Sequence, residues 1–439
     1  MRELKLYIDS RCGDDFASGT SPETAWASLE KLNSVTLNGG DEICFRRSCV
    51  WHGQLVPKRV RDGEKIRFCP YGEGERPLID GNGAESAVLF ENFDNLIFEG
   101  FEIVNLTEDC FSRRSGLFAV CCKEGGVYSD ICFKDLYIHD VVTCYDRTAG
   151  GLIVWADKAD SPVSFNNLTI ENCFITDCGA QGITVSSAYS YRLGIDWTDL
   201  PYTPSDGIRI CGNYISRCGG DAIFQSCGNS PVIEHNVAAD CCFAGNTAYA
   251  GIWPHNSQDT VMRYNESFGN RLVGGDGQGY DVDINCTNTT VYANYSHQNG
   301  GGNILLCTSG DIGGYNNGIT VEENVSIDDG GQIFTLSGPI RDIRIKNNTV
   351  YVSRNLHTRL IGLYQWGESG GGPDDVSVEG NDFELNTDGY NTFYEGSVVT
   401  FSGNRYAGTY NYDGICDSTP VTDGGSRKLR KTVYGFEPF

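Results

Sequence analysis

The sequence is short of proline, of basic residues and of long apolar runs. Its 439 residues include 13 Pro against 55 Gly. This balance is unlike a Pro-rich disordered tract and indicates a folded chain with many turns. No apolar run approaches the roughly 20 residues that span a bilayer, which argues against a membrane-spanning helix. The opening RELKLYIDS lacks the apolar core of a signal peptide, so we expect a cytoplasmic protein, or an extracellular one if a leader has been removed.

Basic residues are outnumbered by acidic ones. There are 33 Lys and Arg against 58 Asp and Glu, a formal net charge of −25. A surface this acidic repels phosphate backbones and anionic lipid. The charge therefore argues against nucleic-acid and membrane partners, argues more weakly against a polyanionic polysaccharide, and favours a neutral ligand.

Cysteine is abundant, but the cysteines do not have the spacing that is typical of zinc ligands. The 19 Cys include no CxxC pair with a matching second pair, which argues against a zinc site. A chain of this length needs no disulfide frame to hold its core. We therefore expect most cysteines to be reduced, buried small hydrophobic residues, in keeping with a cytoplasmic or anaerobic setting.

Helical periodicity is nearly absent after residue 34, and short β runs that end in Gly or Asn turns replace it. One asparagine follows the first strand of each repeat, and these asparagines are spaced 23 to 33 residues apart. They are Asn213, Asn236, Asn265, Asn294, Asn324, Asn348, Asn381 and Asn404. A period of roughly 20 to 35 residues with three short strands is typical of a parallel β-solenoid. Asn tolerates left-handed backbone and can form side-chain ladders between coils, so we predict an all-β parallel β-helix of about ten coils rather than a β-sandwich.

A short amphipathic helix is predicted near the start, in TSPETAWASLEKLN (20–33). Ser21 suits the N-cap and Pro22 the first helical position. One face of such a helix carries Ala25, Leu29 and Leu32. A helix of this kind could cover the open end of a solenoid.

The opening as a whole, from LYIDSRCGDDF to CVWHGQL, resembles the start of right-handed parallel β-helix carbohydrate-active enzymes. The resemblance implies a right-handed solenoid, and it identifies a fold rather than a reaction. We accordingly predict an N-terminal cap with the first strands at 1–90, a parallel β-helix catalytic domain at 91–410 and a C-terminal tail at 411–439.

Three aspartates gather in GGDGQGYDVDINC (274–286). Strand side chains alternate between faces, so Tyr280, Val282 and Ile284 share one face and Asp281, Asp283 and Asn285 the other. Ionised carboxylates are costly inside an apolar core unless they are paired, which makes the apolar face the core and turns the aspartates outward. Asp276 lies in the preceding Gly-rich turn, which could fold back over the same strand.

The neighbouring coils contribute side chains suited to sugars. In GIWPHN, one coil earlier, the same alternation turns Trp253 and His255 outward. Aromatic faces stack on sugar C–H surfaces, His, Asn and Gln bond hydroxyls, and Trp366 farther along could form a rim. The predicted substrate-binding set is Asp281, Gln278, Trp253, His255, Asn285 and Trp366.

Glycoside hydrolysis requires two carboxyl groups that flank the scissile bond, one protonated and one ionised. Like charges at short range raise one pKa, which supplies that difference. Two alternatives stay open: a calcium site of Asp276, Asp281 or Asp283 with backbone carbonyls, and a structural Asp/Gly turn. Trp253 considered alone could equally be a packing residue or a sugar-binding residue. We predict no cofactor and no metal, apart from a structural calcium if that alternative holds.

Residues 263–307, RYNESFGN to NILLC, resemble the catalytic coil of β-helix glycosidases such as the lacto-N-biosidases of glycoside hydrolase family 136. In that family the acid/base and the nucleophile are aspartates seven residues apart on this coil, as Asp276 and Asp283 are here. The resemblance implies Asp276 as general acid/base, Asp283 as nucleophile, a retaining mechanism and release of lacto-N-biose from milk-type oligosaccharides. It also implies a companion domain or subunit needed for folding. Asp281 is a rival for either role.

The sequence thus predicts a retaining exo-glycosidase acting on a β-linked neutral oligosaccharide in a groove beside residues 253–306. One rival is another β-helix glycosidase such as a β-xylosidase. A polysaccharide lyase is a second, but it needs cationic groups that the acidic strand lacks. A non-catalytic carbohydrate-binding β-helix would keep Trp253 without any reason for paired carboxylates.

Overall fold

The computed structural model describes residues 4–61, 63–192, 200–245, 247–312, 314–368, 370–421, 429–432 and 435–438. The chain forms two compact units: Met1–Tyr189 with Ser205–Gly220 (unit 1), and Ser190–Pro204 with Asp221–Phe439 (unit 2). Among the described residues, regular structure is β apart from helix α1 (Leu29–Ser34) and two 3-10 turns, η1 (Pro22–Thr24) and η2 (Gly310–Ile312). None of the described helices is long and apolar enough to cross a bilayer.

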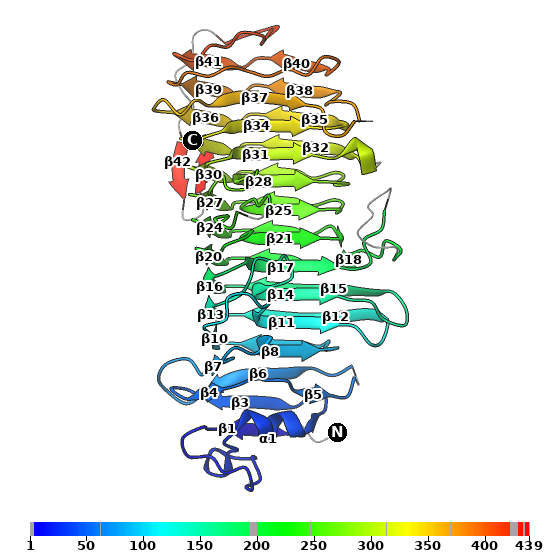
Figure 1. Cartoon of the computed structure of the whole chain (residues 1–439), viewed down its shortest axis with the longest axis vertical. Helices are drawn as coiled ribbons and strands as arrows, with labels where there is room; N and C mark the ends of the chain where they lie inside the picture. The colour runs from blue at the N-terminus through cyan, green and yellow to red at the C-terminus, as the bar shows by residue number, and fades with distance from the viewer. Residues whose placement is uncertain are drawn as a thin grey trace. The chain divides into compact units, whose positions relative to one another are not determined.

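Unit 1 winds through three parallel sheets, one strand from each coil to each sheet (Figure 1). The first sheet holds β1 (Lys5–Ile8), β3 (Glu42–Arg46), β6 (Ile66–Tyr71), β9 (Leu96–Glu99), β12 (Gly126–Lys134), β15 (Val163–Glu171) and β19 (Arg209–Cys211). The second holds β4 (Val50–His52), β7 (Leu78–Asp80), β10 (Glu102–Asn105), β13 (Tyr137–Val141), β16 (Phe174–Cys178) and β20 (Tyr214–Ser216). The third holds β8 (Ser86–Glu91), β11 (Ser115–Cys121), β14 (Gly150–Ala156) and β17 (Gln181–Ser187). Short strands β2 (Thr36–Leu37), β5 (Lys58–Arg59) and β18 (Ser205–Asp206) complete the unit.

Unit 2 repeats the same three-sheet winding. Its first sheet holds β23 (Val232–Glu234), β26 (Val261–Arg263), β29 (Thr290–Tyr292), β32 (Asn316–Glu322), β35 (Ile340–Lys346), β38 (Val376–Glu379) and β40 (Val399–Ser402). The second holds β24 (Val237–Ala239), β27 (Glu266–Phe268), β30 (Tyr295–His297), β33 (Val325–Ile327), β36 (Thr349–Val352), β39 (Asp382–Leu385) and β41 (Arg405–Gly408). The third holds β21 (Ile223–Ser226), β25 (Ile252–His255), β28 (Gln278–Asp283), β31 (Gly302–Cys307), β34 (Gln332–Ser337) and β37 (Arg359–Tyr364). The short β22 (Gly228–Asn229) follows β21, and β42 (Leu429–Thr432) pairs antiparallel with β43 (Gly435–Pro438) in the predicted tail.

These pairings confirm the predicted parallel β-helix. Stacking of equivalent positions builds its core, because no single coil can bury its own apolar face. In the third sheet of unit 2 the register aligns the side chains of one inner column, all of them buried. They are Ile223, Ile252, Tyr280, Ile304, Phe334 and Ile361. The Tyr280 hydroxyl donates to the carbonyl oxygens of Asn265 and Tyr295, both at 2.9 Å, so this large polar ring is satisfied inside the coil.

The repeated asparagines form the predicted ladder in unit 2. The Oδ1 atom of Asn294 accepts from the backbone N of Asn265 at 3.0 Å and from its Nδ2 at 2.9 Å. The same pattern links Asn236 through to Asn404. The left-handed residue of each turn is the one before the asparagine, such as Tyr264 (φ 56°) or Ala293 (φ 52°). The ladder asparagines thus do not use their tolerance of left-handed backbone; their buried side chains serve hydrogen bonding instead.

The predicted N-terminal helix is divided in two. Ser21 and Pro22 begin only the turn η1, and the chain is extended at Trp26, which bridges to Ile8 of β1. The Asp15 carboxylate then accepts from the backbone N of Ala27 at 2.8 Å. Helix α1 begins after Ser28, whose Oγ accepts from the N of Lys31, and it buries Leu29 and Leu32 beside β1. Pairing with β1 outweighs the local helix signal at 25–28.

Candidate active site

The aspartate strand β28 lies between β25 and β31 in the third sheet of unit 2. Its register sets Asp283 opposite His255 on one side and opposite Cys307 on the other. Because Tyr280 points into the core, alternation turns Asp281 and Asp283 to the outer face, as predicted. Cys307 joins them there from the next coil.

Asp281 is almost completely buried although it lies on the outer face. Only 3% of its surface is exposed. Burial, and then the nearby charges of Asp283 and Asp276, raise the pKa of the Asp281 carboxyl well above its usual range. A raised pKa favours the protonated form of the carboxyl, which makes Asp281 less suited than an ionised carboxylate to act as a nucleophile.

Cys307 donates a hydrogen bond to Asp283. Its Sγ lies 3.1 Å from Asp283 Oδ1 and 3.9 Å from Asp281 Oδ1. Burial, and then the charges of Asp283 and Asp281, raise the pKa of the Cys307 thiol well above its usual value. The thiol therefore stays protonated, and it donates to Asp283. The sequence prediction missed Cys307, although the same alternation applied to GNILLC places it beside Asp283.

Asp276 lies in the turn between β27 and β28 and is half-buried. The turn is held on both sides: the Gly277 N donates to the Tyr249 carbonyl at 2.7 Å, and the Gly277 carbonyl accepts from the Gly301 N at 3.0 Å. Gly277 has φ 80°, a conformation that favours glycine. The charge of Asp276 acts on both Asp281 and Cys307, so the turn does bring this carboxyl back toward the strand.

A second buried acid was missed by the sequence prediction. Asp221 is fully buried, and its Oδ1 accepts from the backbone N of Ala250 at 2.9 Å. Its charge is a further, smaller influence that raises the pKa of Asp281. In the sequence, GGDAIF reads as an ordinary turn, and strand alternation gives no reason to link it with the aspartate strand.

The oxygens of Asp281 and Asp283 and the Cys307 sulfur lie within 4.8 Å of one another, close enough to hold an ion. Calcium, however, takes about six to eight oxygen ligands. A buried protonated thiol beside two carboxyls is a poor match for that ion, so this donor set gives the calcium alternative little support.

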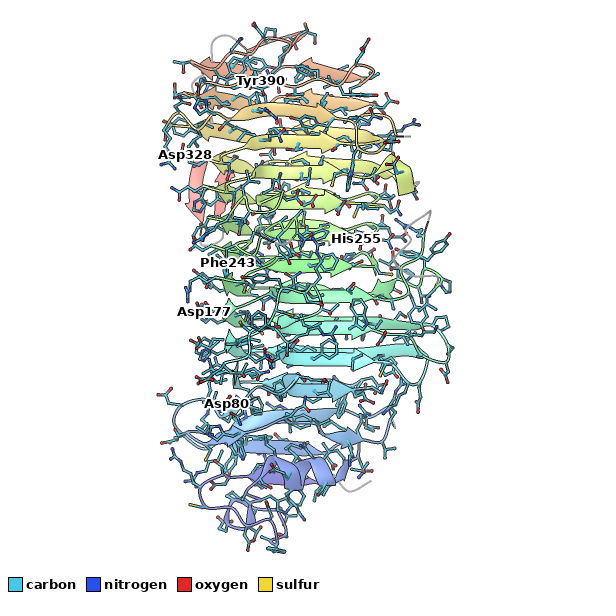
Figure 2. The ribbon with its side chains drawn as sticks, viewed as in Figure 1. Asp80, Asp177, Phe243, His255, Asp328 and Tyr390 are labelled. Carbon is cyan, nitrogen blue, oxygen red and sulfur yellow. The ribbon has the colours of Figure 1, made fainter. Side chains whose placement is uncertain are left out.

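Trp253 and His255 lie on the predicted face but are covered. Trp253 is 2% exposed, and His255, which is labelled in Figure 2, is fully buried. The Trp253 ring centroid lies 4.4 Å from that of Phe224, and Ala250 packs on the same cluster. His255 Nδ1 lies 2.9 Å from the Ser226 Oγ. Neither side chain offers surface to a sugar in this structure, and their substrate role stays a prediction.

Asn285 and Gln278 have other surroundings than predicted. The Asn285 Nδ2 donates to the Arg192 carbonyl and its Oδ1 accepts from the Tyr315 N, both at 2.9 Å. Asn285 thus ties two segments to the end of β28. Gln278 is buried at the start of the strand, and alternation puts it on the inner face with Tyr280. Neither placement favours direct contact with a sugar.

Trp366 fits the predicted rim. Its side chain is 39% exposed, and its carbonyl accepts from the Gly310 N at 3.1 Å. Gly310 comes three residues after Cys307, so the Trp366 segment borders the strand end that carries the thiol.

No family model matches the chain. A lacto-N-biosidase of Bifidobacterium longum subsp. longum is 26% identical over 79% of this chain, which corresponds to 27% of that protein. The crystal structure of a GH136 lacto-N-biosidase from Eubacterium ramulus superimposes with a TM-score of 0.69 at 25% identity, over 80% of this chain and 64% of that one. The chain resembles the lacto-N-biosidases of glycoside hydrolase family 136. It spans about a quarter of the curated relative.

A xylose complex of XylC shares the fold alone. It matches with a TM-score of 0.54 at 14% identity, over 97% of this chain and 87% of that one. The resemblance to the family 136 lacto-N-biosidases therefore rests on both sequence and structure, whereas the likeness to XylC rests on the β-helix fold alone.

Proposed function

We propose that the protein is a retaining glycoside hydrolase that releases lacto-N-biose from neutral milk-type oligosaccharides. The observation that carries the proposal is the cluster on β28 and β31, in which Asp283 accepts a hydrogen bond from the Cys307 thiol beside Asp281, whose pKa is raised by burial. The likeness to lacto-N-biosidases supplies the substrate class. The net charge of −25 is consistent with a neutral substrate.

Asp283 is the nucleophile in this proposal. It is the less buried of the two strand aspartates, so it is the one that a sugar can reach. A hydrogen bond from Cys307 to the carboxylate favours its ionised form. Ionised Asp283 attacks the anomeric carbon and forms a glycosyl-enzyme ester, which water later hydrolyses.

Asp276 is the general acid/base. It protonates the leaving glycosidic oxygen in the first step and takes a proton from water in the second. Its place in a turn held by both neighbouring coils gives a fixed carboxyl without burying it. Retention requires the carboxyls of Asp276 and Asp283 to lie about 5 to 5.5 Å apart during the reaction.

Asp281 serves as a positioning residue. Burial raises the pKa of its carboxyl, and in the protonated form that carboxyl can donate to a neighbouring oxygen within the cluster but cannot attack carbon. This division of roles weighs against Asp281 as the rival nucleophile.

The test compares three variants on two substrates, each expressed with and without a companion subunit because the family resemblance implies one. Asp283→Asn is expected to lower turnover of aryl glycosides and oligosaccharides by about three orders of magnitude or more. Asp276→Asn is expected to slow oligosaccharides far more than activated aryl glycosides, because only the former need the proton. Near-normal activity of Asp283→Asn together with an inactive Asp281→Asn would reverse the role assignment.

A chelation experiment separates the calcium alternative. If EDTA lowers the Tm of the wild type while all three Asn variants keep their activity, the cluster binds calcium and the catalytic proposal fails. An unchanged Tm with EDTA supports the proposal.

A further inference from the structure

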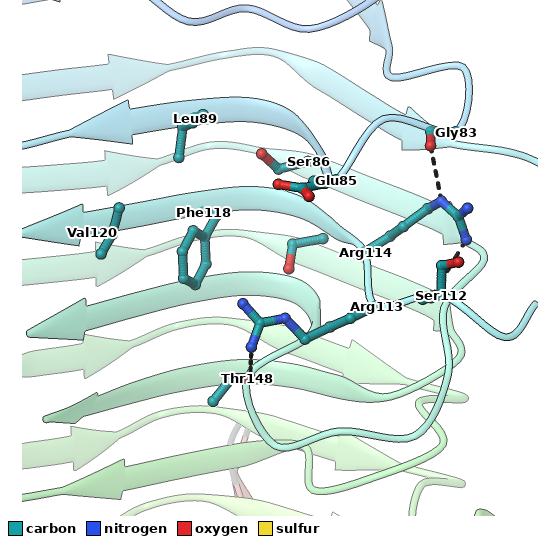
Figure 3. Close-up of a pocket in the computed structure, with 11 residues that line it drawn as sticks. Gly83, Glu85, Ser86, Leu89, Ser112, Arg113, Arg114, Phe118, Val120 and Thr148 are labelled. Carbon is teal, nitrogen blue, oxygen red and sulfur yellow. Dashed lines mark hydrogen bonds between the residues drawn. The ribbon is translucent and has the colours of Figure 1, made fainter. Parts of the chain in front are cut away.

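A hollow of about 640 Å³ opens on the outer face of the third sheet in unit 1 (Figure 3). Strands β8 and β11 form its floor, and the turns before β8, β11 and β14 form its wall. Its volume falls in the range of about 300 to 1,000 Å³ that is usual for small-molecule sites. All of its lining residues belong to unit 1, whereas the aspartate cluster belongs to unit 2.

The floor of the hollow is apolar and includes an aromatic ring. The register pairs Phe118 with Leu89, and both side chains are half-buried, so part of each surface faces solvent. Val120, two residues farther along β11, lies on the same face. Figure 3 shows these three side chains on one side of the hollow and the arginines on the other.

Arg114 makes the wall rigid. It is 8% exposed, and its Nε donates to the Gly83 carbonyl at 2.9 Å. Its Nη2 donates to Asp109 Oδ2 at 2.7 Å, which neutralises the guanidinium. The backbone N of Arg114 donates to Thr143 Oγ1 at 2.8 Å, and the Cys144 N donates to the Ser112 carbonyl at 3.1 Å. Three successive turns are thus tied together before any ligand binds.

Arg113 and Glu85 carry the remaining charges of the lining. Arg113 is exposed; its Nη1 donates to Thr148 Oγ1 at 2.6 Å, and its guanidinium carbon lies 5.9 Å from the Phe118 ring centroid. Among the described residues it pairs with no carboxylate, although the chain has 58 Asp and Glu. Glu85 is also exposed and makes no ion pair within the described part of the chain. The lining therefore offers one strong donor and one strong acceptor with no net charge.

We propose that this hollow binds one ring of a neutral saccharide without cleaving it. The Phe118 ring covers a C–H face of the sugar, Arg113 donates to its oxygens, and Glu85 accepts from its hydroxyls. A lining with no net charge, on a chain of net charge −25, selects against acidic sugars. Among the described residues that line this hollow, Glu85 is the one carboxyl, and hydrolysis needs two. This binding activity goes beyond the proposed hydrolysis.

The experiment titrates the whole chain carrying Asp283→Asn with lacto-N-biose in a calorimeter, with 3′-sialyllactose as the acidic probe. Addition of Phe118→Ala is expected to remove one of two binding sites, or to weaken the site by about tenfold or more. Arg113→Ala is expected to remove or weaken lacto-N-biose binding at this site to a similar extent. The matched control is Phe111→Ala, because Phe111 is 87% exposed in the same turn and does not line the hollow.

Equal binding in the Phe118→Ala and Phe111→Ala proteins would overturn the proposal, as would tighter binding of 3′-sialyllactose than of lacto-N-biose. The proposed hydrolysis is scored separately, on an aryl glycoside with Asp283 intact. In that assay the Phe118→Ala variant is expected to hydrolyse the aryl glycoside at the wild-type rate. If the protein with Asp283 intact shows no glycosidase activity but its binding of lacto-N-biose still depends on Phe118, the proposed hydrolysis is contradicted and the proposed binding site is supported.

Discussion

At the scale of single residues, the distinctive contact is the thiol of Cys307 against the carboxylate of Asp283. A hydrogen bond to an ionised carboxylate lowers its pKa, so loss of the donor raises it. Cys307→Ala is therefore expected to move the acidic limb of kcat/KM to higher pH, whereas Cys307→Ser, which keeps a donor, moves it less. The measurement is the pH profile of aryl glycoside hydrolysis. Identical profiles for Ala, Ser and wild type would show that the thiol does not tune Asp283.

Asp281 gives a stability prediction with a definite sign. Its pKa is raised on folding, so its contribution to stability is fully present below the unfolded pKa of about 3.9 and is lost as pH rises toward the folded value. Asparagine at position 281 does not titrate, so the Asp281→Asn variant does not lose this stability as the pH rises. The variant is expected to be more stable than the wild type at pH 7, with the difference shrinking toward pH 4. Urea unfolding at both pH values measures it, and a less stable variant at pH 7 contradicts it.

At the scale of elements, the asparagine ladder ties each coil of unit 2 to the next. Asn294→Ala removes an acceptor of two hydrogen bonds from Asn265 and a donor to Met262 and Asn324, all buried. Leaving such groups unpaired costs about 1 to 3 kcal/mol each, so we expect a loss of roughly 3 kcal/mol in the free energy of unfolding. Asn317→Ala is the control, because Asn317 is exposed on β32 and does not belong to the ladder. Equal losses in both variants would mean that the ladder adds nothing.

The strands show what local pattern can predict. Alternation in QGYDVDIN predicted the outward aspartates, and the spacing of the asparagines predicted both the parallel winding and the ladder. The same rule could not predict that Trp253 is buried, because its cluster includes Ala250, which lies in a turn with no strand pattern. Nor could it predict that Asn285 holds Arg192, a residue 93 positions away. Long-range packing of turns, unlike strand periodicity, has no short sequence signature.

At the scale of the whole chain, all 19 cysteines are free, and most are buried as the composition predicts. Only Cys12, Cys110 and Cys416 are exposed. Ellman's reagent is therefore expected to react quickly with about three thiols in the native protein and with all 19 after unfolding without reductant. Mass spectrometry that found several intact disulfides would contradict this and would also overturn the expected cytoplasmic setting.

The ladders of unit 2 have a direction. In each step the amide of one coil donates to the oxygen of the following coil, so all the donors face the same way along the stack. The long ladder ends where Asn404 Nδ2 donates to Asp417 Oδ2 at 2.7 Å, and a shorter one, Asn270 to Asn299, ends on Asp329 Oδ1 at 3.0 Å. An ionised carboxylate accepts and cannot donate, so aspartate is a terminator that passes no hydrogen bond forward. One more step of either ladder would require asparagine in place of that aspartate. The coils continue past Asp329 through β34 to β41, so the acidic residue sets the length of a ladder and not the length of the solenoid.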